Sequence, residues 1–403
     1  MKMSDNNIRP SKSSLPYVLG FLAFWANGEN YAAASLLPSI AADLKLSISE
    51  AGLSVTAYML SFGLFTIIFG PLSDKFGKGR VIKVAALGTS LFSILVGFSF
   101  NLESLMFFRV MSGLLGAGIF PVTMALIGAE FGDRERQGAM AKVLGLGFLG
   151  GALATVIGGV LAQFGSWRGV YILYGLAELV LSILVLRLVP NGNIARGPFN
   201  IFKFYAAAFR NPQLISMISV VLAIGFSVFG SFSFSGYYVQ TLTGFPIITV
   251  GLIVAAFGVG SITSSKLLPV LQPILKTALV PVAGIVGALS VLTLLIPLAS
   301  GQPSTPSLVI GYFGFGLAFV LLQSTLVMNA QAQLPMMRGT VMSLVSFGMF
   351  VGGGLGSLAN GALIASGHIE WMYIIAGVLT LSGAFSLWTI LSIIGRKRRH
   401  SLA

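Results

Sequence analysis

The sequence predicts an all-α membrane protein with twelve transmembrane helices, arranged as two parallel six-helix repeats. Of its 403 residues, 56% are hydrophobic and only 9% are charged, whereas a soluble globular chain carries about 25% charged residues. Long apolar segments recur along the chain, each close to the ~20 residues that cross a bilayer as an α-helix. The third observation is an internal repeat with an offset of half the chain length.

Twelve apolar segments are long enough to serve as membrane spans. We expect them at residues 16–38, 50–72, 81–101, 104–127, 140–164, 169–189, 213–236, 246–269, 278–299, 306–331, 338–365 and 371–394. The connections between these segments are mostly short. Almost the whole chain is therefore expected to lie in or beside the bilayer.

The internal repeat appears when the chain is compared with itself at an offset of 202 residues. Residues 136–175 and 338–377 then share 13 identities. The offset corresponds to six spans, so equivalent helices keep the same orientation, as in parallel repeats related by an axis along the membrane normal. We expect an N-terminal six-helix bundle at 1–189, a cytoplasmic linker at 190–212 and a C-terminal bundle with a basic tail at 213–403. Two such bundles can rock about a central site and give alternating access.

The cationic residues are distributed unequally between the two sides of the predicted membrane. An even number of spans places both termini on one side, and 21 of the 24 Lys and Arg residues fall there. Lys45 and Arg168 fall on the other side, and Arg109 lies within a span. The positive-inside rule makes the crowded side cytoplasmic. We expect a multi-pass protein of the cell membrane, plasma or inner, with both termini cytoplasmic.

The net charge of +13 follows from this asymmetry and does not indicate nucleic-acid binding. The basic tail at 396–399 is expected to lie against anionic lipid headgroups. The sequence has no cysteine, which excludes disulfides, thiolate metal sites and cysteine nucleophiles. We expect no enzyme activity, no metal and no cofactor. The expected partners are a small-molecule substrate, protons and the lipid bilayer, with the protein as a monomer.

The loop between the second and third spans reads GPLSDKFGKGRV. Its Gly70, Asp74, Gly77 and Arg80 resemble the G-x-L-x-D-R/K-x-G-R/K motif of the major facilitator superfamily. The resemblance implies the major facilitator fold and a conformational latch in which Asp74 contacts the positive N-terminus of the eleventh span, near Arg338. The alternative is an ordinary basic cytoplasmic turn.

The fourth span contains Leu105, Arg109 and Gly113 at the spacing of the family's L-x-x-x-R-x-x-Q-G motif, with Ser112 in place of Gln. In the proton-coupled branch, this resemblance implies that Arg109 tunes a nearby carboxylate. The alternative is that Arg109 extends its guanidinium to the outer headgroups, since it lies only ~7.5 Å from the helix start at 1.5 Å per residue.

Further segments resemble the twelve-span drug:proton antiporter branch of the superfamily. These are LLPSIAADLKLS, SWRGVY and the glycine-rich fifth span. In the fifth span Gly158 and Gly159 match the antiporter motif, but Ala154 and Thr155 stand where Gly-Pro is expected. The kink that Pro would supply is therefore absent, and close packing of small residues is an alternative role for this helix.

Polar residues gather in the middle of the first span, in the segment FWANGENYAAASLLP. On a helix, Asn27, Asn30 and Tyr31 cluster on one side, and Glu29 lies roughly opposite Asn27 and Tyr31. Because polar groups face both sides, we expect protein and water to surround this helix and the helix to line a central cavity. Glu29 lies ~16 Å from the outer end of its helix and Glu178 ~14 Å from the outer end of the sixth span, so the two carboxylates have similar depths.

We hypothesise that Glu29 is the principal proton site, with Arg109 and Glu178 completing a proton-coupling set. Removal from bulk water favours the neutral form of a carboxyl group, and an approaching cation favours the ionised form. Such a group can load a proton and release it when the substrate arrives. At the repeat offset these three positions are occupied by Ser231, Gly311 and Thr380. The alternative for either glutamate is a structural role in the packed interior.

The seventh span predicts one polar and aromatic helix face across a substrate cavity. That face consists of Ser227, Ser231, Phe234, Ser235 and Tyr238. The other predicted lining residues are Trp25, Asn27, Asn30, Tyr31, Tyr237 and Gln323. Such a lining suits amphipathic or cationic aromatic compounds through stacking and cation–π contacts. A helix-packing seam is the alternative for the face on the seventh span.

These observations predict a proton-coupled secondary active transporter, an antiporter that exports small amphipathic or drug-like molecules by alternating access. The alternative on the same fold is an exporter or symporter of a polar metabolite such as a sugar. A membrane-embedded enzyme is disfavoured because the spans hold no histidine and no phosphate-loop spacing. A channel would not need the latch motif.

Overall fold

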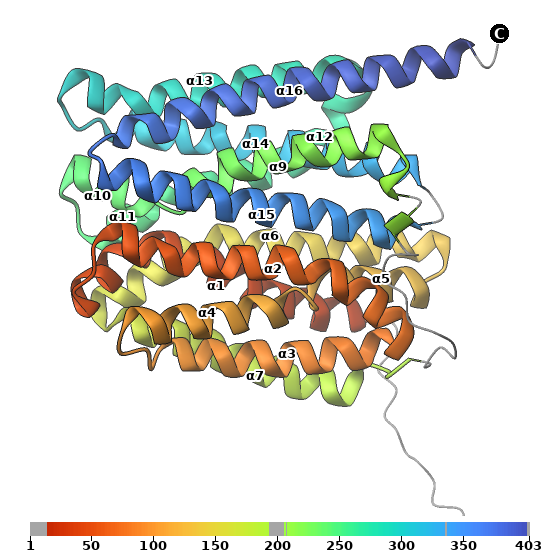
Figure 1. The fold of residues 1–403 in the computed structure, drawn as a ribbon, viewed down its shortest axis with the longest axis horizontal. Helices are drawn as coiled ribbons and strands as arrows, with labels where there is room; N and C mark the ends of the chain where they lie inside the picture. Colours follow the sequence, from red (N-terminus) through yellow and green to blue (C-terminus); the bar gives the residue numbers. More distant parts are fainter. Residues whose placement is uncertain (1–13, 193–204, 207, 335–336, 401–403) are drawn as a thin grey trace, which may run out of the picture.

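The computed structural model describes residues 14–192, 205–206, 208–334 and 337–400. In these ranges the chain forms helices that run roughly parallel to one another, without a strand (Figure 1). The described helices are α1 (Leu15–Leu44), α2 (Ile48–Phe76), α3 (Lys78–Val96), α4 (Leu102–Gly116), α5 (Phe120–Glu130), α6 (Asp133–Phe164), α7 (Trp167–Leu188), α9 (Pro212–Phe232), α10 (Ser235–Thr243), α11 (Ile247–Val254), α12 (Ala256–Leu275), the 3-10 turn η1 (Lys276–Ala278), α13 (Leu279–Ser300), α14 (Thr305–Gln333), α15 (Arg338–Ala365) and α16 (Ile369–His400).

Ten helical segments of the described chain are long and apolar enough to cross a membrane. One of them, residues 247–300, holds two of the predicted spans because it runs from α11 to α13. α1 is not among the ten, since Asn27, Glu29 and Asn30 lower its mean hydropathy. The all-α membrane fold is therefore confirmed, and the helices follow the order of the twelve predicted spans.

Three of the predicted spans are broken helices. The breaks fall at residues 117–119, 233–234 and 255 and separate α4 from α5, α9 from α10 and α11 from α12. The break at 233–234 is short: the Ser233 N–H still donates to the Phe229 carbonyl, and the Tyr238 N–H donates to the Phe234 carbonyl. Side chains before and after this break face the same neighbour, α16.

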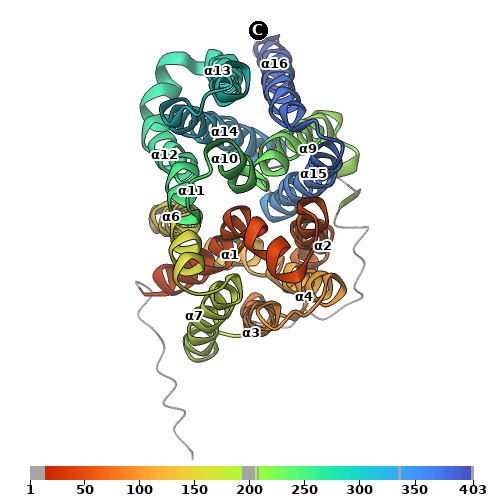
Figure 2. The same ribbon diagram turned by 90° about the vertical axis from the view of Figure 1, so that its left-hand side faces the viewer.

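The helices of the first half, α1 to α7, and those of the second half, α9 to α16, occupy opposite sides of the molecule when it is viewed along the helices (Figure 2). Across the boundary α2 contacts α15, α1 contacts α10, and α6 contacts both α11 and α12. Much of the predicted linker at 190–212 falls outside the described residues, so the division into two bundles stays a prediction. In the described part of the linker, the Tyr205 hydroxyl donates to the Ile67 carbonyl of α2 at 2.7 Å.

α1 occupies a central position between the two halves (Figure 2). It contacts α2, α6 and α7 of its own half as well as α10 and α11 of the other. Glu29 and Asn30 are both buried. The sequence prediction that protein surrounds the first helix is confirmed.

The halves pack closely at one end of the molecule. We call the end where α7 finishes and α9 begins the linker end, and the opposite end the far end. At the far end, Gly236 of α10 packs against the backbone of Ala34, and a Cβ on Gly251 of α11 would lie 2.5 Å from the carbonyl oxygen of Thr155. Only glycine allows helices to approach this closely. The far end is therefore closed between the halves in this conformation.

Candidate functional site

A cavity of about 390 Å³ lies between the two halves. Its apolar lining consists mainly of phenylalanine and methionine: Phe62, Phe120, Phe229, Phe257, Phe319 and Phe350, with Met124, Met140, Met328, Met342 and Met349. Its polar lining consists of amides and hydroxyls: Asn27, Asn30, Tyr31, Ser261, Gln323, Ser324, Gln331 and Ser346. None of the described residues that line this cavity is charged.

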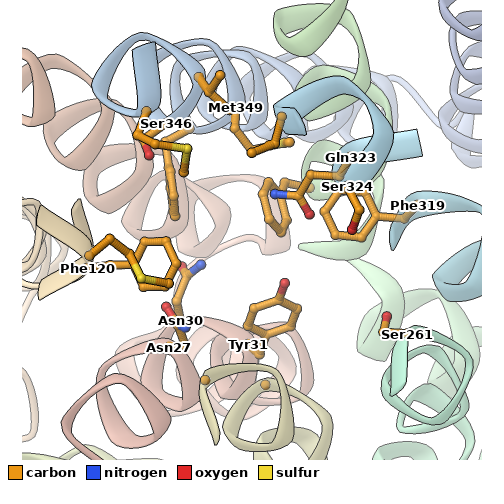
Figure 3. A pocket seen from close by; sticks show the side chains of 18 of the residues that line it. Asn27, Asn30, Tyr31, Phe120, Ser261, Phe319, Gln323, Ser324, Ser346 and Met349 are labelled. Atoms are coloured by element: carbon orange, nitrogen blue, oxygen red, sulfur yellow. The ribbon is translucent and has the colours of Figure 1, made fainter. Parts of the chain in front are cut away.

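The cavity extends from the middle of the molecule towards the linker end. Asn27, Asn30 and Tyr31 of α1 point into it from one side, and Gln323 and Ser324 of α14 from another (Figure 3). Its lining continues through Met140 near the start of α6, Gln331 near the end of α14 and Met342 near the start of α15, all at the linker end. Because the far end is closed, any opening between the halves faces the linker end.

Aromatic rings from both halves meet at the centre of the cavity. Phe62 of α2 stacks on Phe350 of α15 with ring centroids 4.0 Å apart, and Phe350 lies 5.7 Å from Phe229 of α9. Tyr31 meets Phe229 edge-on at 6.0 Å and Phe232 at 5.4 Å. Such ring pairs offer both faces and edges to an aromatic ligand.

Four of the eleven lining residues predicted from the sequence lie in this lining, namely Asn27, Asn30, Tyr31 and Gln323. Trp25 lies outside it and packs edge-on against Tyr174 of α7, with centroids 5.2 Å apart. No clear sequence signal would have separated Trp25 from its neighbours. The apolar lining residues were missed for a related reason, since phenylalanines and methionines that face a cavity, a helix or lipid look alike in one sequence.

Ser231, Phe234 and Tyr238 are fully buried and do not line the cavity. Ser231 donates to the Ser227 carbonyl at 2.5 Å, and the ring of Tyr238 meets that of Tyr373 on α16 edge-on. The polar face of the seventh span thus packs against α16 on both sides of the break at 233–234. Phe234 packs against Gly52 of α2, at the boundary between the halves. In this conformation the predicted face is a packing seam, the alternative stated above.

A second polar cluster lies inside the first half, on the other side of α1. A guanidinium nitrogen of Arg109, on α4, lies 2.7 Å from Oε1 of Glu29 in a buried ion pair. Ser93 of α3 donates to the other carboxylate oxygen of Glu29, and Ser112 donates to Oε1 at 3.5 Å. The expected contact between Arg109 and a carboxylate is present.

Arg109 is enclosed by protein. Its side chain has no exposed surface, and its guanidinium lies 4.3 Å from the ring centroid of Tyr58 and 5.5 Å from that of Tyr171. Its Nε atom donates to the Ser54 carbonyl at 3.4 Å. The alternative in which Arg109 extends to the outer headgroups is therefore wrong.

Glu178 of α7 is also buried in the first half, with no exposed surface. Neither of its carboxylate oxygens has a hydrogen-bond partner among the described residues. The hydroxyl of Ser182, one turn later, donates to the backbone carbonyl of Glu178 rather than to its side chain. Glu29 and Glu178 thus share one interior, but only Glu29 is hydrogen-bonded there.

α1 separates the charged cluster from the cavity. Asn27, Asn30 and Tyr31 line the cavity, whereas Glu29 does not and instead contacts α3 and α4. This agrees with the helical periodicity, which placed Glu29 opposite Asn27 and Tyr31. A ligand in the cavity would therefore meet the amide side of α1 and not the carboxylate.

The sequence prediction of a loop at residues 70–81 is wrong, because α2 continues to Phe76, α3 begins at Lys78 and Gly77 alone lies between them. Asp74 lies 2.7 Å from Lys78, and Arg80 donates to the Phe76 carbonyl at 3.3 Å. Gly77 adopts a positive φ of 94°, and a Cβ added to it would lie 2.4 Å from the carbonyl oxygen of Asn191.

The predicted latch requires this segment to contact α15. Gly70 of α2 faces Ser343 of α15, where an added Cβ would lie 2.9 Å from the serine hydroxyl oxygen. The described partner of Asp74 is Lys78 and not the start of α15. The side chain of Arg338 falls outside the described part of the structure. The role of Gly70, Asp74, Gly77, Arg80 and Arg338 as a latch stays a prediction.

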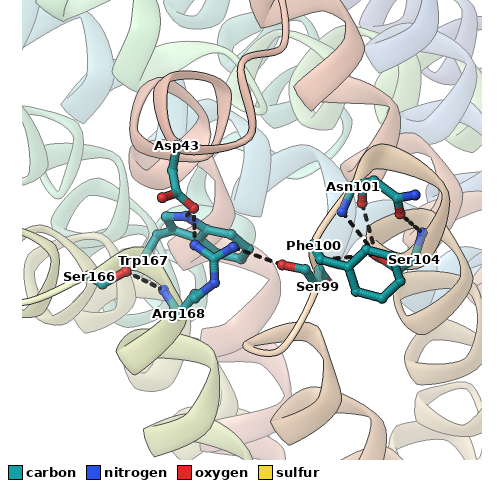
Figure 4. A network of polar contacts seen from close by, with 8 residues as sticks. All are labelled: Asp43, Ser99, Phe100, Asn101, Ser104, Ser166, Trp167 and Arg168. Atoms are coloured by element: carbon teal, nitrogen blue, oxygen red, sulfur yellow. Dashed lines mark hydrogen bonds and ion pairs between the residues drawn. The ribbon is translucent and has the colours of Figure 1, made fainter.

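Two further segments singled out in the sequence meet at the far end (Figure 4). Asp43, in the last turn of α1, forms an ion pair with Arg168 and accepts a hydrogen bond of 3.0 Å from the Trp167 indole. Arg168 also donates to the Ser99 carbonyl at 2.8 Å. These contacts hold the far ends of α1, α3 and α7 together within the first half.

Comparison with known proteins identifies the family. The sequence model of the Major Facilitator Superfamily matches residues 19–346. The chain belongs to this superfamily. A bacterial homologue of the human lysosomal transporter Spinster, solved in an inward-facing and unoccupied conformation, superposes with a TM-score of 0.74 over 94% of this chain and 98% of that one, at 14% identity. As a member of this superfamily, the protein is a membrane transporter.

The relatives of this major facilitator protein differ in what they carry. The puromycin resistance protein pur8 of Streptomyces alboniger is 25% identical over 79% of this chain and 75% of its own. A probable nitrate/nitrite transporter, NarK2 of Mycobacterium tuberculosis, is 30% identical over 60% of this chain and 62% of its own. An uncharacterized transporter of Buchnera aphidicola is 28% identical over 50% of this chain, which spans about half (49%) of that relative.

Proposed function

We propose that this protein is a proton-coupled secondary active transporter that exports small, uncharged amphipathic molecules by alternating access. The observation that carries the proposal is the cavity between the halves, whose described lining is aromatic and methionine-rich and has no charge. Methionine side chains are flexible and polarizable and suit surfaces that accept ligands of different shapes. A few amides and hydroxyls supply hydrogen bonds that orient the ligand.

The lack of charge in the lining favours this substrate class over a charged metabolite. Moving an ion from water into an apolar site without a counter-ion has a large free-energy cost. An anion such as nitrate would need a cationic partner, and no Lys or Arg is found among the described lining residues. A sugar would need more hydrogen-bonding groups than a lining made mostly of phenylalanine and methionine offers. We therefore do not propose the polar-metabolite alternative.

The proposed direction rests on the open end of the cavity. By the positive-inside rule, the excess of Lys and Arg places the linker end on the cytoplasmic side of a cell membrane. A cavity that reaches this end can load a substrate from the cytoplasm or from the inner leaflet. The contacts of Gly236 and Gly251 at the far end must then separate to release it. The junction of α2 and α3 would stabilise one of the two conformations through a contact between Asp74 and the start of α15.

Proton coupling is proposed from the charged cluster behind α1. Glu29, Arg109 and Glu178 are buried between helices of the first half and do not line the cavity. Substrate and proton therefore occupy different sites. They would influence each other through movement of α1, which carries Asn30 on the cavity side and Glu29 on the cluster side. Coupling through a helix requires that each ligand favours a different conformation of it.

Reconstitution in proteoliposomes tests the proposal. A ligand is first identified by thermal shift in detergent at two pH values. With an acidified lumen, we expect addition of this ligand to release protons from the vesicles. The proton gradient should drive saturable uptake of the ligand without ATP. Uptake that is independent of the pH gradient would contradict antiport.

A pair of tryptophan variants tests whether the cavity is the substrate site. Ser324→Trp places a large side chain in the cavity, and Ser382→Trp places the same side chain on the exposed face of α16. We expect the first to abolish ligand-dependent proton release and the second to retain it. Equal loss in both variants would contradict the assignment.

A further inference from the structure

The two buried glutamates of the first half have unequal surroundings. Glu29 accepts hydrogen bonds from Arg109, Ser93 and Ser112 and has an ion-pair distance of 2.7 Å. Glu178 is buried to the same extent and accepts none from the described residues. An isolated ionised carboxylate in such surroundings would be far more costly than a neutral carboxyl group.

The charge balance of the cluster points the same way. Glu178 interacts electrostatically with Glu29 on α1 and with Tyr58 on α2, and Tyr171 and Tyr174 lie on its own helix. Arg109 on α4 lies against Glu29 and the rings of Tyr58 and Tyr171. Arg109 is the one cation among them, so it can balance a single carboxylate. The geometry assigns that balance to Glu29, because Arg109 lies against it.

We propose that Glu178 carries the exchangeable proton and that Glu29 remains ionised in its pair with Arg109. This reverses the hypothesis drawn from the sequence, in which Glu29 was the principal proton site. One part of this assignment rests on the proposed function, namely that the proton on Glu178 exchanges during transport. The protonation states themselves follow from the contacts and can be measured without a substrate.

The surrounding groups show how proton release would act on the conformation. When the O–H bond of the Glu178 carboxyl group breaks and the proton passes to water, the cluster gains one negative charge. That charge lies near Glu29 and is only partly balanced by Arg109, one of whose guanidinium nitrogens, Nη2, has no partner among the described residues. Deprotonation is therefore unfavourable in this closed packing and favours a conformation in which Glu178 reaches water.

Two tyrosines mark the side from which a proton would arrive. Tyr171 and Tyr174 precede Glu178 by seven and four residues, so all three share one face of α7. Both tyrosine hydroxyls are buried without a partner among the described residues. Tyr174 also packs against Gly28 of α1, where an added Cβ would lie 2.7 Å from its ring. Movement of α1 would thus change the surroundings of this face.

Infrared spectroscopy of the full-length protein in detergent tests the assignment. A protonated carboxyl group has a carbonyl stretch that an ionised carboxylate lacks and that shifts in deuterated water. We expect this band in the wild-type protein at neutral pH and its loss in Glu178→Gln. Persistence of the band in Glu178→Gln, or its absence from the wild-type protein, would overturn the proposal.

The matched control removes the ion pair and leaves Glu178 in place. In the double variant Glu29→Gln, Arg109→Met, Glu178 has no nearby cation, so the band should remain. Loss of the band in this double variant, with retention in Glu178→Gln, would assign the proton to Glu29. If Glu178→Gln fails to fold, Glu178→Asp supplies a second reading, since a shifted band still identifies residue 178.

Transport measurements separate failure of this assignment from failure of the proposed function. If the infrared result is as expected but the wild-type protein releases no protons on ligand addition, Glu178 is protonated and the proposed antiport is wrong. If the wild-type protein does release protons and Glu178→Gln releases them with the same pH dependence, the antiport stands and Glu178 is not the carrier.

Discussion

The interiors of the two halves solve the same packing problem with different chemistry. Glu29, Arg109 and Glu178 in the first half correspond at the repeat offset to Ser231, Gly311 and Thr380 in the second. The first set forms a buried ion pair with an unpartnered carboxyl group beside it. The second set is neutral and lies within a network of hydroxyl groups.

The neutral network leaves fewer groups without partners. The Ser227 and Thr380 hydroxyls lie 2.7 Å apart, and Ser227 also donates to the Ala376 carbonyl at 2.7 Å. The Tyr312 and Tyr373 hydroxyls likewise lie 2.7 Å apart. A six-helix half can therefore be packed around hydroxyls alone. The second half thus shows that this fold can pack without buried charges, and the free-energy cost of burying them in the first half motivates the role proposed above.

The largest expected effect comes from removing the one cation of the charged interior. Arg109→Met leaves Glu29 buried without a counter-charge, and breaking a buried pair in this way costs about 3–5 kcal/mol. We expect a large fall in the thermal unfolding temperature in detergent. The defect should deepen as pH rises, because Glu29 can lower the cost at low pH by binding a proton.

The double variant Glu29→Gln, Arg109→Met tests the same comparison from the other side. Replacing both members of a buried pair is often neutral or stabilising. We expect it to recover most of the stability that Arg109→Met loses, which would make the first half as neutral as the second. A double variant as unstable as Arg109→Met would show that the pair is required for packing after all.

The next effect concerns the cavity between the two interiors. Its described lining is uncharged although a charged cluster lies on the other side of α1. A neutral aromatic ligand should therefore bind at least tenfold more tightly than its quaternary ammonium analogue of similar size, or about 1.4 kcal/mol. Cation–π contacts contribute about 2 kcal/mol or more where they are desolvated, whereas burying an ion without a counter-ion costs far more. Thermal shift titrations of the matched ligands measure the difference.

Tighter binding of the ammonium analogue would contradict the separation of the uncharged cavity from the charged cluster. Such a result would mean that a carboxylate reaches the ligand, as in the hypothesis drawn from the sequence. Repeating the titration with Glu29→Gln and with Glu178→Gln would then identify which carboxylate it is.

The sequence identified more of the residues in the charged interior than of those that line the cavity. Charged residues are rare in membrane spans, so Glu29, Arg109 and Glu178 stand out, and helical period placed Glu29 opposite Asn27 and Tyr31. The partner of each charge could not be predicted, because three residues from three helices meet only in the folded bundle. The structure resolves this by pairing Arg109 with Glu29 and leaving Glu178 alone.

The cavity lining was predicted where it is polar and missed where it is apolar. Asn27, Asn30, Tyr31 and Gln323 are amides or a phenol within apolar spans and were identified. The helical period grouped Ser227, Ser235 and Tyr238 on one face, but this face packs against α16 and not along the cavity. A polar face directed at a cavity and one directed at a neighbouring helix have the same period, so the sequence could not distinguish them.

A smaller effect is expected in the neutral interior. Thr380→Val removes one hydroxyl of the pair with Ser227, and a hydrogen bond of this kind contributes about 1 kcal/mol. Ser227 keeps its bond to the Ala376 carbonyl, which limits the loss. We expect a modest fall in unfolding temperature that does not vary with pH. A pH-dependent change would show that this hydroxyl pair is coupled to a titrating group.

The smallest effect lies at the far end of the first half, where α2 begins with a cap that the second half lacks. The carboxylate of Glu50 accepts hydrogen bonds from the Ser47 backbone N–H at 2.8 Å and from its hydroxyl at 2.7 Å. At the repeat offset Glu50 corresponds to Leu252, so this interaction has no counterpart at the equivalent position of the second half.

Protonation of the Glu50 carboxylate would weaken the two hydrogen bonds that it accepts from Ser47, so the contribution of this cap to stability is present at neutral pH and lost at acidic pH. Glu50→Gln keeps a capping side chain but cannot titrate. We expect the variant to be slightly less stable than the wild-type protein at neutral pH and equally stable at acidic pH, where Glu50 itself is protonated. Unfolding temperatures measured between neutral and acidic pH should therefore converge. Parallel curves would mean that the acid response of the first half arises in its buried cluster and not at this cap.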